Sequence, residues 1–429
     1  MMNYSWKFSR HALFSLSGIS VLLVLFGAIT AQGATYHVAT TGNDANPGTL
    51  NQPFKSFKKG VSQLQPGDTL YIRGGLYTEQ IDLQTPNKTG TAGNYITIGG
   101  YPGETVTLKF SDTLNPGYGP IKARGNRGYF IFENLILDGS ASTDASRSNW
   151  AIRDGNHHFI LRNLEIKNFK NVSAIFIKAE NITVQNCKLH DQVSTLGTSG
   201  TYHYGIYLSD GNNILIEGSD FYNNAGGGMQ IYPGPLSKVV IRNNKFHDNN
   251  TKTTIHIGGL IVMSAKGNIS DVTIYNNLLY NNGSAPTSGD APGLRVEAAS
   301  STTTTGVKVW NNTIYNNKGY GIKIGSGVSI AAQNNIIFEN TKGEILNLGS
   351  GSLINHNLTT DPKFVKAEAF DFRLQANSRA IDEGIDLGEV ATDFKNLPRP
   401  QGMAYDIGAL EGNGSDIKSI STPQKLSIR

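Results

Sequence analysis

A short motif recurs through the middle of the chain and constrains its fold more than any other feature. Each copy has a short apolar strand, one or two Asn residues and an apolar–aromatic–polar triplet, as in residues 273–281. We align the copies on Asn134, Asn163, Asn186, Gly218, Asn244, Asn277, Asn312, Asn335 and Asn357. The steps between these positions are 29, 23, 32, 26, 33, 35, 23 and 22 residues. A fixed motif with variable spacing indicates a solenoid, and its β-branched, period-two units indicate strands.

Residues 1–33 have the pattern of a cleaved signal peptide. Lys7 and Arg10 precede an apolar stretch, and Ala31-Gln-Gly33 supplies small residues for cleavage. The alternative is an uncleaved membrane anchor, because the stretch approaches spanning length. We therefore expect a secreted, extracellular or periplasmic protein with no stable membrane association after cleavage.

Charge and cysteine content exclude some classes of function. The formal net charge is +4, and loss of Lys7 and Arg10 leaves 35 basic against 33 acidic residues, or +2. This balance does not predict nucleic-acid binding. The one cysteine, Cys187, lies inside a repeat, where a buried structural thiol is expected rather than a nucleophile.

The N-terminal part of the expected solenoid has the pattern of a cap. Phe54, Phe57, Val61 and Leu64 have helical spacing, and an amphipathic helix would cover the open strand edges of the first coil. We expect one domain over 34–411 in a monomeric protein. Its parts are a cap (34–79), coils (about 80–360) and a closing segment (361–411), followed by a flexible tail (412–429).

The opening segment also resembles a known family. The matching residues are Tyr36, Val38, Gly42, Asp44, Asn46, Pro47, Gly48, Thr49, Pro66, Gly67, Asp68 and Thr69. This run resembles the entry segment of right-handed parallel β-helix proteins of the pectin-lyase-like superfamily. The resemblance covers roughly residues 35–360 and implies an all-β fold, a right-handed parallel β-helix with an N-terminal capping helix. It leaves the reaction open, because that superfamily includes lyases, hydrolases, epimerases, esterases and adhesins.

A second strand precedes each repeat, and its alternation predicts which side chains face outward. If the aliphatic residues face the interior, their neighbours form two columns on the outer face. The first column is Lys122, Ala151, Phe176, Tyr207, Gln230, Ile261, Arg295 and Lys323. The second column is Arg124, Arg153, Lys178, Ser209, Tyr232, Met263, Glu297 and Gly325.

These columns predict a surface that binds an acidic polysaccharide. Basic residues on adjacent coils suit carboxylates, and exposed rings suit stacking on sugar faces. The alternative is a solvated face that keeps the protein soluble. The expected substrate-binding residues are Lys122, Arg124, Tyr207, Gln230, Tyr232, Arg295 and Glu297. Long connections into the same strands would wall this face.

The leading hypothesis for the reaction is β-elimination on a uronic-acid polymer. The reaction needs a neutralised carboxylate, a base for the adjacent C–H and a proton for the leaving oxygen. We expect Lys178 as the base, Arg153 as the partner of the substrate carboxylate and His203 as the acid. We also expect Arg153 on the coil before Lys178, with Tyr207 and Ser209 on the coil after.

Other chemistries remain open at this point. Lyases of the family often use Ca²⁺, so Ca²⁺ is possible here, but the Asp cluster of the calcium-dependent pectate lyases is missing and no metal ligand can be named. A glycoside hydrolase on the same fold would need two carboxylates facing one bond. A non-catalytic carbohydrate-binding or surface protein would keep the groove without the chemistry.

Overall fold

The computed structural model describes residues 33–111, 119–142, 150–170, 172–193, 203–251, 257–283 and 290–412. The signal-peptide prediction lies outside the described residues except at Gly33, and the predicted tail lies outside them except at Gly412. The described residues from Gly33 to Gly412 belong to one compact unit. In the part of the chain that is described, no helix is long and apolar enough to cross a membrane.

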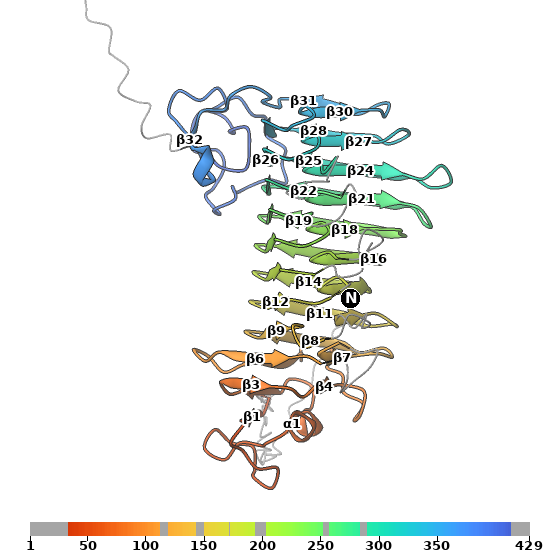
Figure 1. The fold of residues 1–429 in the computed structure, drawn as a ribbon, viewed down its shortest axis with the longest axis vertical. Coiled ribbons are helices and arrows are strands. Elements are labelled where there is room, and N and C mark those ends of the chain that lie inside the picture. Colours follow the sequence, from red (N-terminus) through yellow and green to blue (C-terminus); the bar gives the residue numbers. More distant parts are fainter. Residues whose placement is uncertain are drawn as a thin grey trace, which may run out of the picture. The chain divides into compact units, whose positions relative to one another are not determined.

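The described unit is a stack of coils built from three parallel sheets (Figure 1). We call the longest one sheet A. It consists of β1 (Thr35–Val38), β2 (Thr69–Ile72), β5 (Ile96–Gly100), β8 (Gly128–Glu133), β11 (His157–Arg162), β14 (Glu180–Gln185), β16 (Ile206–Glu217), β19 (Leu236–Arg242), β22 (Ile269–Tyr275), β25 (Thr304–Trp310), β28 (Ile330–Gln333) and β31 (Leu353–Asn355).

Sheets B and C complete each coil. Sheet B consists of β3 (Gly75–Tyr77), β6 (Val106–Lys109), β9 (Ile136–Asp138), β12 (Glu165–Lys167), β15 (Lys188–His190), β17 (Asp220–Tyr222), β20 (Lys245–His247), β23 (Leu278–Tyr280), β26 (Thr313–Tyr315) and β29 (Ile336–Phe338). Sheet C consists of β10 (Trp150–Ile152), β13 (Ile175–Lys178), the first part of β16, β18 (Met229–Ile231), β21 (Leu260–Ser264), β24 (Leu294–Ala298), β27 (Ile322–Ile324) and β30 (Ile345–Asn347). The pair β4 (Ile81–Asp82) and β7 (Ile121–Lys122) precedes sheet C.

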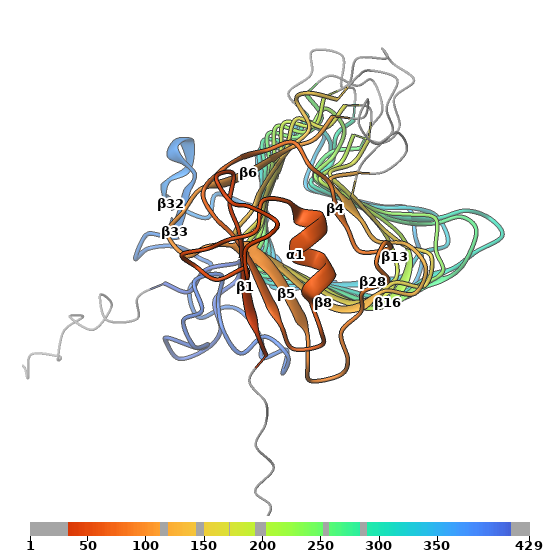
Figure 2. The same ribbon diagram turned by 90° about the horizontal axis from the view of Figure 1, so that it is seen from below.

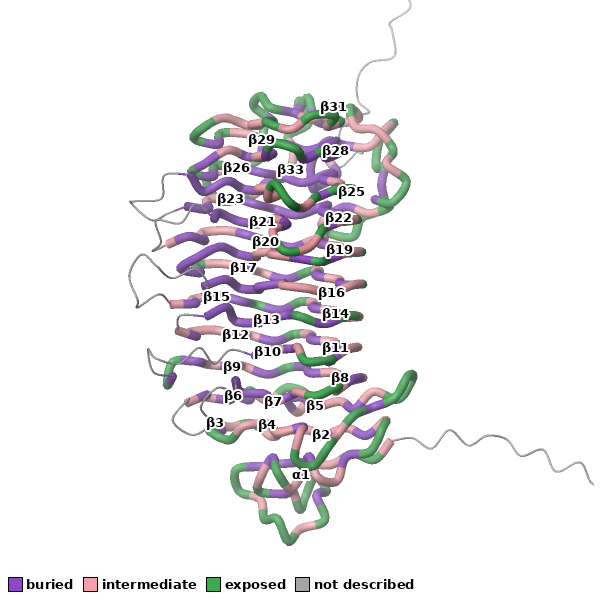
Figure 3. The backbone as a smooth tube through the Cα atoms, turned by 90° about the vertical axis from the view of Figure 1, so that its right-hand side faces the viewer, coloured by how far each residue is buried: buried purple, intermediate pink, exposed green. Residues whose placement is uncertain are grey.

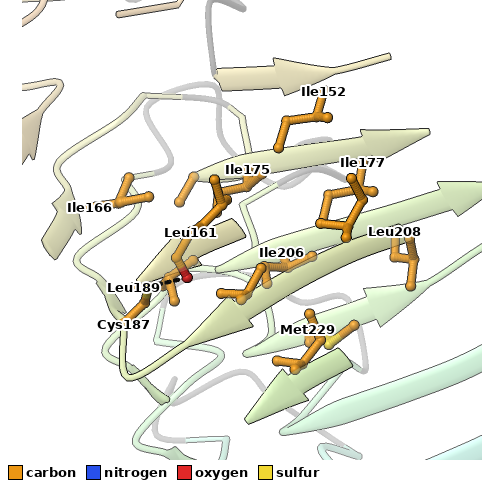
Figure 4. Packing of buried hydrophobic residues seen from close by; sticks show 14 of the residues in the cluster. Ile152, Leu161, Ile166, Ile175, Ile177, Cys187, Leu189, Ile206, Leu208 and Met229 are labelled. Atoms are coloured by element: carbon orange, nitrogen blue, oxygen red, sulfur yellow. Dashed lines mark hydrogen bonds between the residues drawn. The ribbon is translucent and has the colours of Figure 1, made fainter. Parts of the chain in front are cut away.

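The alternation predicted for sheet C is confirmed, and with it the parallel β-helix. Ile175, Ile177, Ile206 and Leu208 are fully buried, and each stacks on its counterpart in the next coil (Figure 4). Identical strand phase from coil to coil places apolar side chains in continuous interior columns. Figure 3 shows exposed residues gathered in the N-terminal region and around β31, whereas the strands between are mostly buried or half-buried.

A helix covers the N-terminal end of the stack, as predicted. The helix α1 spans Phe57–Gln63, shorter than the apolar pattern suggested, and begins where the Ser56 side chain accepts a hydrogen bond from the Lys59 N–H at 3.1 Å. Phe57 and Val61, on the inner face of α1, are fully buried. Figure 2 shows α1 lying across the interior of the first coils.

The repeated Asn residues form hydrogen-bonded ladders inside the turns. The ladder between sheets A and B runs through Asn244, Asn277, Asn312, Asn335 and Asn357, with side-chain N···O distances of 2.9–3.0 Å. The sequence pattern did not separate it from a second ladder at the end of sheet B. That ladder runs through Asn224, Asn249, Asn282, Asn317 and Asn340.

The alignment of the repeats was wrong by one residue in the second half. Glu217 pairs with Arg242, so Gly218 corresponds to Asn243 and the step there is 25 rather than 26 residues. Asn243 adopts positive φ, as Gly218 does, whereas the next residue enters the ladder. Cys187 occupies that buried ladder position, where its N–H donates to Ser219 Oγ. Burial raises the pKa of the Cys187 thiol to about 12, as expected for a structural cysteine.

The closing segment packs against the sides of the stack rather than on the last coil alone. It contains the antiparallel pair β32 (Phe364–Lys366) and β33 (Asp371–Leu374), joined through the 3-10 helix η2 (Ala367–Ala369). Phe372 contacts the rings of Tyr280 and Tyr315 on sheet B, and Val390 packs with Tyr275 and Trp310 at the outer face of sheet A. Its core therefore covers several coils of both sheets.

Candidate functional site

The outer face of sheet C carries the first predicted column. Strand register places Ala151, Phe176, Tyr207, Gln230 and Ile261 in line, followed by Arg295 and Lys323. The alternation rule alone sufficed here because no register shift lies before this column in any of these strands. Connections at the boundary with sheet A project outward beside this face, most clearly after β24 (Figure 1).

The second predicted column contains an error at its centre. The register between β13 and β16 shifts after Ile177, so Lys178 pairs with Asp210 and not with Ser209. Ser209 is the extra residue of a β-bulge. A carboxylate therefore lies beside Lys178 where a hydroxyl was expected, and the Lys178 Nζ to Asp210 Oδ2 distance is 3.8 Å.

The predicted basic residues lie together at the N-terminal end of sheet C, but carboxylates partly neutralise them. Lys122 pairs with Asp82 at 3.0 Å, and Arg124 and Arg153 both lie 3.6 Å from Asp154. With the Lys178–Asp210 pair, we call these residues the cationic group, in which the ion pairs of the described residues set four basic side chains against three acidic ones. Two guanidinium groups share the carboxylate of Asp154.

Lys178 is the most accessible member of this cationic group. Its side chain is 57% exposed, compared with 37% for Arg153 and 31% for Arg124. Ile152 pairs with Ile177, so Arg153 and Lys178 follow each other at the ends of neighbouring strands. The expectation that Arg153 lies on the coil before Lys178 is therefore confirmed.

The middle of the outer face is an aromatic and apolar cluster rather than an open platform. Tyr207 is only 8% exposed, because Tyr204 and Ile257, from the connections entering sheet C, pack against it with Ile261. Phe176 stacks on Tyr207 with ring centroids 5.6 Å apart. The rings that remain half-buried, and so reachable from solvent, are those of Phe176 and Tyr232.

The remaining predicted residues occupy the C-terminal part of the face or lie behind it. Arg295 and Glu297 form an ion pair at 2.6 Å. Gln230 is half-buried and lies in register between Tyr207 and Ile261 of the cluster. His203 is buried, with 1% exposed. In this conformation His203 can influence a substrate only through the residues that cover it.

A groove of about 870 Å³ lies where sheet C turns into sheet A, and the sequence analysis did not anticipate it. Lys178 and Asp210 line it together with Glu180, Asn212 and Ser237. We call this the corner groove. The sequence feature that could have predicted this groove is the shortness of the connections at the corner. Ala179 alone separates β13 from β14, and β16 runs through the corner unbroken.

Stacked rings and carboxylates occupy the outer face of sheet B. His247 lies between Tyr222 and Tyr280, with ring centroids 5.3 and 4.8 Å away, so this histidine packs within the stack of rings. Burial alone would lower the pKa of His247, but hydrogen bonds and charge from Asp220 and Asp248 raise it to about 9. The charged imidazole of His247 therefore has a structural role on the outer face of sheet B.

The described residues do not group acidic ligands as a calcium site would. Within the described ranges, no three His, Cys, Asp or Glu side chains are grouped so as to hold a metal ion. Asp82, Asp154 and Asp210 are instead each paired with basic side chains. No step of the mechanism proposed below is therefore routed through calcium.

Comparison with known proteins agrees with this architecture. The family model described as right handed beta helix region matches residues 173–359, and one described as Pel9A-like, right handed beta helix region matches residues 36–201. "Pectate lyase PEL9" of Emericella nidulans is 36% identical over 88 residues, covering 20% of this chain and 21% of that protein. "Pectate lyase L" of Paenibacillus polymyxa is 24% identical over 352 residues, covering 80% of this chain and 66% of that protein.

Two solved structures share the fold. Pectate lyase Pel9A superposes with a TM-score of 0.58 at 19% identity, over 89% of this chain and 97% of that chain. The complex of XylC with xylose superposes with a TM-score of 0.50 at 12% identity, over 89% of this chain and 99% of that chain. The chain spans about a fifth of the length of the first curated relative and just under two thirds of the Paenibacillus protein. Family models, relatives and the stacked parallel sheets agree that the chain is a right-handed parallel β-helix protein, similar to the pectate lyases of the pectin-lyase-like superfamily.

Proposed function

We propose that this protein is a secreted polysaccharide lyase that cleaves a uronic-acid polymer by β-elimination. The polymer lies along the outer face of sheet C and crosses the cationic group. The observation that carries the proposal is the exposed Lys178 at the end of β13, with Arg153 on the preceding coil. The pectate lyases among its relatives support an acidic polymer as the substrate.

The cationic group supplies the first requirement of the reaction. A uronate carboxylate must be neutralised before the neighbouring C–H becomes acidic enough to lose its proton. Arg124 and Arg153 share Asp154 at 3.6 Å each, distances longer than a hydrogen bond. A substrate carboxylate would bind to the guanidinium group of Arg153, because Arg153 is next to Lys178.

Lys178 supplies the base. In its neutral form the amine takes the proton from the carbon next to the carboxylate, a C=C bond forms, and the C–O bond to the leaving sugar breaks. The leaving oxygen then takes a proton. His203 is the acid expected for this step. Because His203 is buried, the half-buried phenol of Tyr232 on the same face is a second candidate for the acid.

The test is a substrate screen with matched variants. Wild type is assayed on polygalacturonate, alginate and glycosaminoglycans, with and without Ca²⁺, by the ultraviolet absorbance of the unsaturated product. Lys178→Ala should lower kcat by about 10²–10⁴-fold with little change in binding. Lys188→Ala is the control, because Lys188 is exposed on sheet B of the same coil. Near-normal turnover by Lys178→Ala would remove Lys178 as the base.

Other products would point to the alternative functions. New reducing ends without an unsaturated product would indicate a hydrolase, for which Glu180 and Asp210 in the corner groove are the carboxylates to replace first. Retention on an acidic polymer without any turnover would indicate a binding protein.

A further inference from the structure

The corner groove exists because the row of connections between sheets C and A is interrupted. Four residues link the strands on the coil below, at 153–156, and on the two coils above, at 232–235 and 265–268. On the two coils between, the link is Ala179 alone or is absent, because β16 is continuous over twelve residues. The neighbouring connections therefore form the walls of the groove, and the two short coils form its floor.

This gap joins the groove to the proposed substrate face. Lys178 and Asp210 stand at the end of sheet C and also line the groove. A polymer that passes Lys178 on the outer face would therefore have the opening of the groove beside it. A substituent on that sugar residue could enter while the main chain stays on sheet C. The volume of about 870 Å³ lies in the range of about 300–1,000 Å³ usual for ligand sites.

The charges of the groove differ from those of the substrate face. Glu180 and Asp210 are set against one cation, Lys178. Burial, and then the neighbouring His158, lower the pKa of His157 from its ordinary value of 6.5, so this imidazole adds no positive charge at neutral pH. The groove therefore has a negative excess, which disfavours a second carboxylate.

Neutral polar groups line the rest of the groove. Ser237 and Ser270 lie in register on β19 and β22, and Asn212 pairs with Ser237 from β16. The buried Oδ1 of Asn212 accepts no hydrogen bond from any residue that the structure describes. A buried acceptor without a donor is costly, and a ligand hydroxyl would satisfy it.

We infer that the corner groove binds a neutral, hydroxyl-rich sugar branch of the acidic polymer whose main chain lies on sheet C. This inference rests on the proposed function and narrows it to a branched substrate. Cations on the outer face hold the uronate backbone, while carboxylates and amide and hydroxyl groups in the groove select an uncharged side residue. Each well-made hydrogen bond to a charged group is worth about tenfold in affinity.

The test compares a linear and a branched form of one backbone. The Kd of wild type is measured for polygalacturonate and for a galacturonan that carries single xylose branches. The branched polymer should bind about tenfold more tightly, as expected for one added hydrogen bond to a charged group. Ser237→Trp fills the groove and should remove this difference while leaving the affinity for polygalacturonate unchanged.

The control is Thr305→Trp, because Thr305 occupies the same column two coils above and does not line the groove. It should keep the preference for the branched polymer, and thermal unfolding should show both variants folded. Equal binding of the two polymers by wild type overturns the inference alone, as does an unchanged preference in folded Ser237→Trp. Failure of wild type to bind either polymer overturns the proposed function together with the inference.

Discussion

Removal of one amide from the ladder between sheets A and B should cost far more stability than a typical polar substitution. Asn312 is fully buried, and its Nδ2 donates to Ile274 O at 2.9 Å and to Asn335 Oδ1 at 3.0 Å. Its Oδ1 accepts from the main-chain N–H of Asn277 at 2.9 Å. The Asn312 side chain also donates to Trp310 O and accepts from Asn277 Nδ2, both at 3.0 Å. Asn312→Ala deletes all five bonds and brings no replacement for the groups left behind.

The expected cost follows from these contacts. An orphaned, buried N–H costs about 1–3 kcal/mol, and each of the other four bonds contributes about 0.5–1.5 kcal/mol. The free energy of unfolding should therefore fall by about 3–9 kcal/mol. Because the ladder is continuous, the loss also interrupts the alignment of the amides on both sides.

The assay is urea unfolding followed by circular dichroism, with Asn357→Ala as the matched variant. Asn357 ends the same ladder and is half-buried, so solvent can replace part of what it provides. Its substitution should cost clearly less than that of Asn312. Equal losses for the two variants, or a loss below about 1 kcal/mol for Asn312→Ala, would refute the account of the ladder as a buried network.

Three further predictions concern charge and the cap. Because the pKa of His247 is raised to about 9, its stabilisation is complete below pH 6.5 and is lost as pH rises through 9; wild type should lose more stability than His247→Phe between pH 6 and 10, and parallel curves in urea unfolding would contradict this. Phe57→Asp should destabilise the protein by roughly 3–5 kcal/mol, since Phe57 is fully buried against Tyr77, and an unchanged Tm would show that α1 is no cap. Arg124→Ala and Arg153→Ala should each weaken retention on polygalacturonate about two- to fivefold at low salt and less at high salt; a salt-independent loss would argue against charge contacts.

The strand pattern contained most of the fold because its chemistry repeats in every coil. Inward Ile, Leu and Val alternate with polar residues, so the faces of sheet C could be predicted residue by residue. The error in phase arose where Asn-Asn doublets make two neighbouring positions look alike. Asn243 and Asn244 differ only in backbone conformation and burial, which residue type does not distinguish.

The site was less predictable because it depends on contacts between distant segments. Asp82 reaches Lys122 from 40 residues earlier in the chain, and no strand pattern reports such a partner. Tyr207 is buried by Ile257 from a connection, so its position in an outward column did not make it accessible. The bulge at Ser209 could in principle have been predicted from the sequence. Ile177 and Ile182 are five residues apart, whereas their counterparts on the next coil, 208 and 214, are six apart.

The two Asn ladders also make the upper coils interchangeable. From Asn244 onward each coil offers the same amides to the coil above and to the coil below. A duplicated coil between β22 and β25 would meet matching donors and acceptors on both sides. The molecule could thus lengthen in steps of about 4.8 Å without redesign of its interior. The lower coils, where Leu135, Leu164 and Cys187 fill the equivalent position, depend on side-chain volume and do not offer that modular growth.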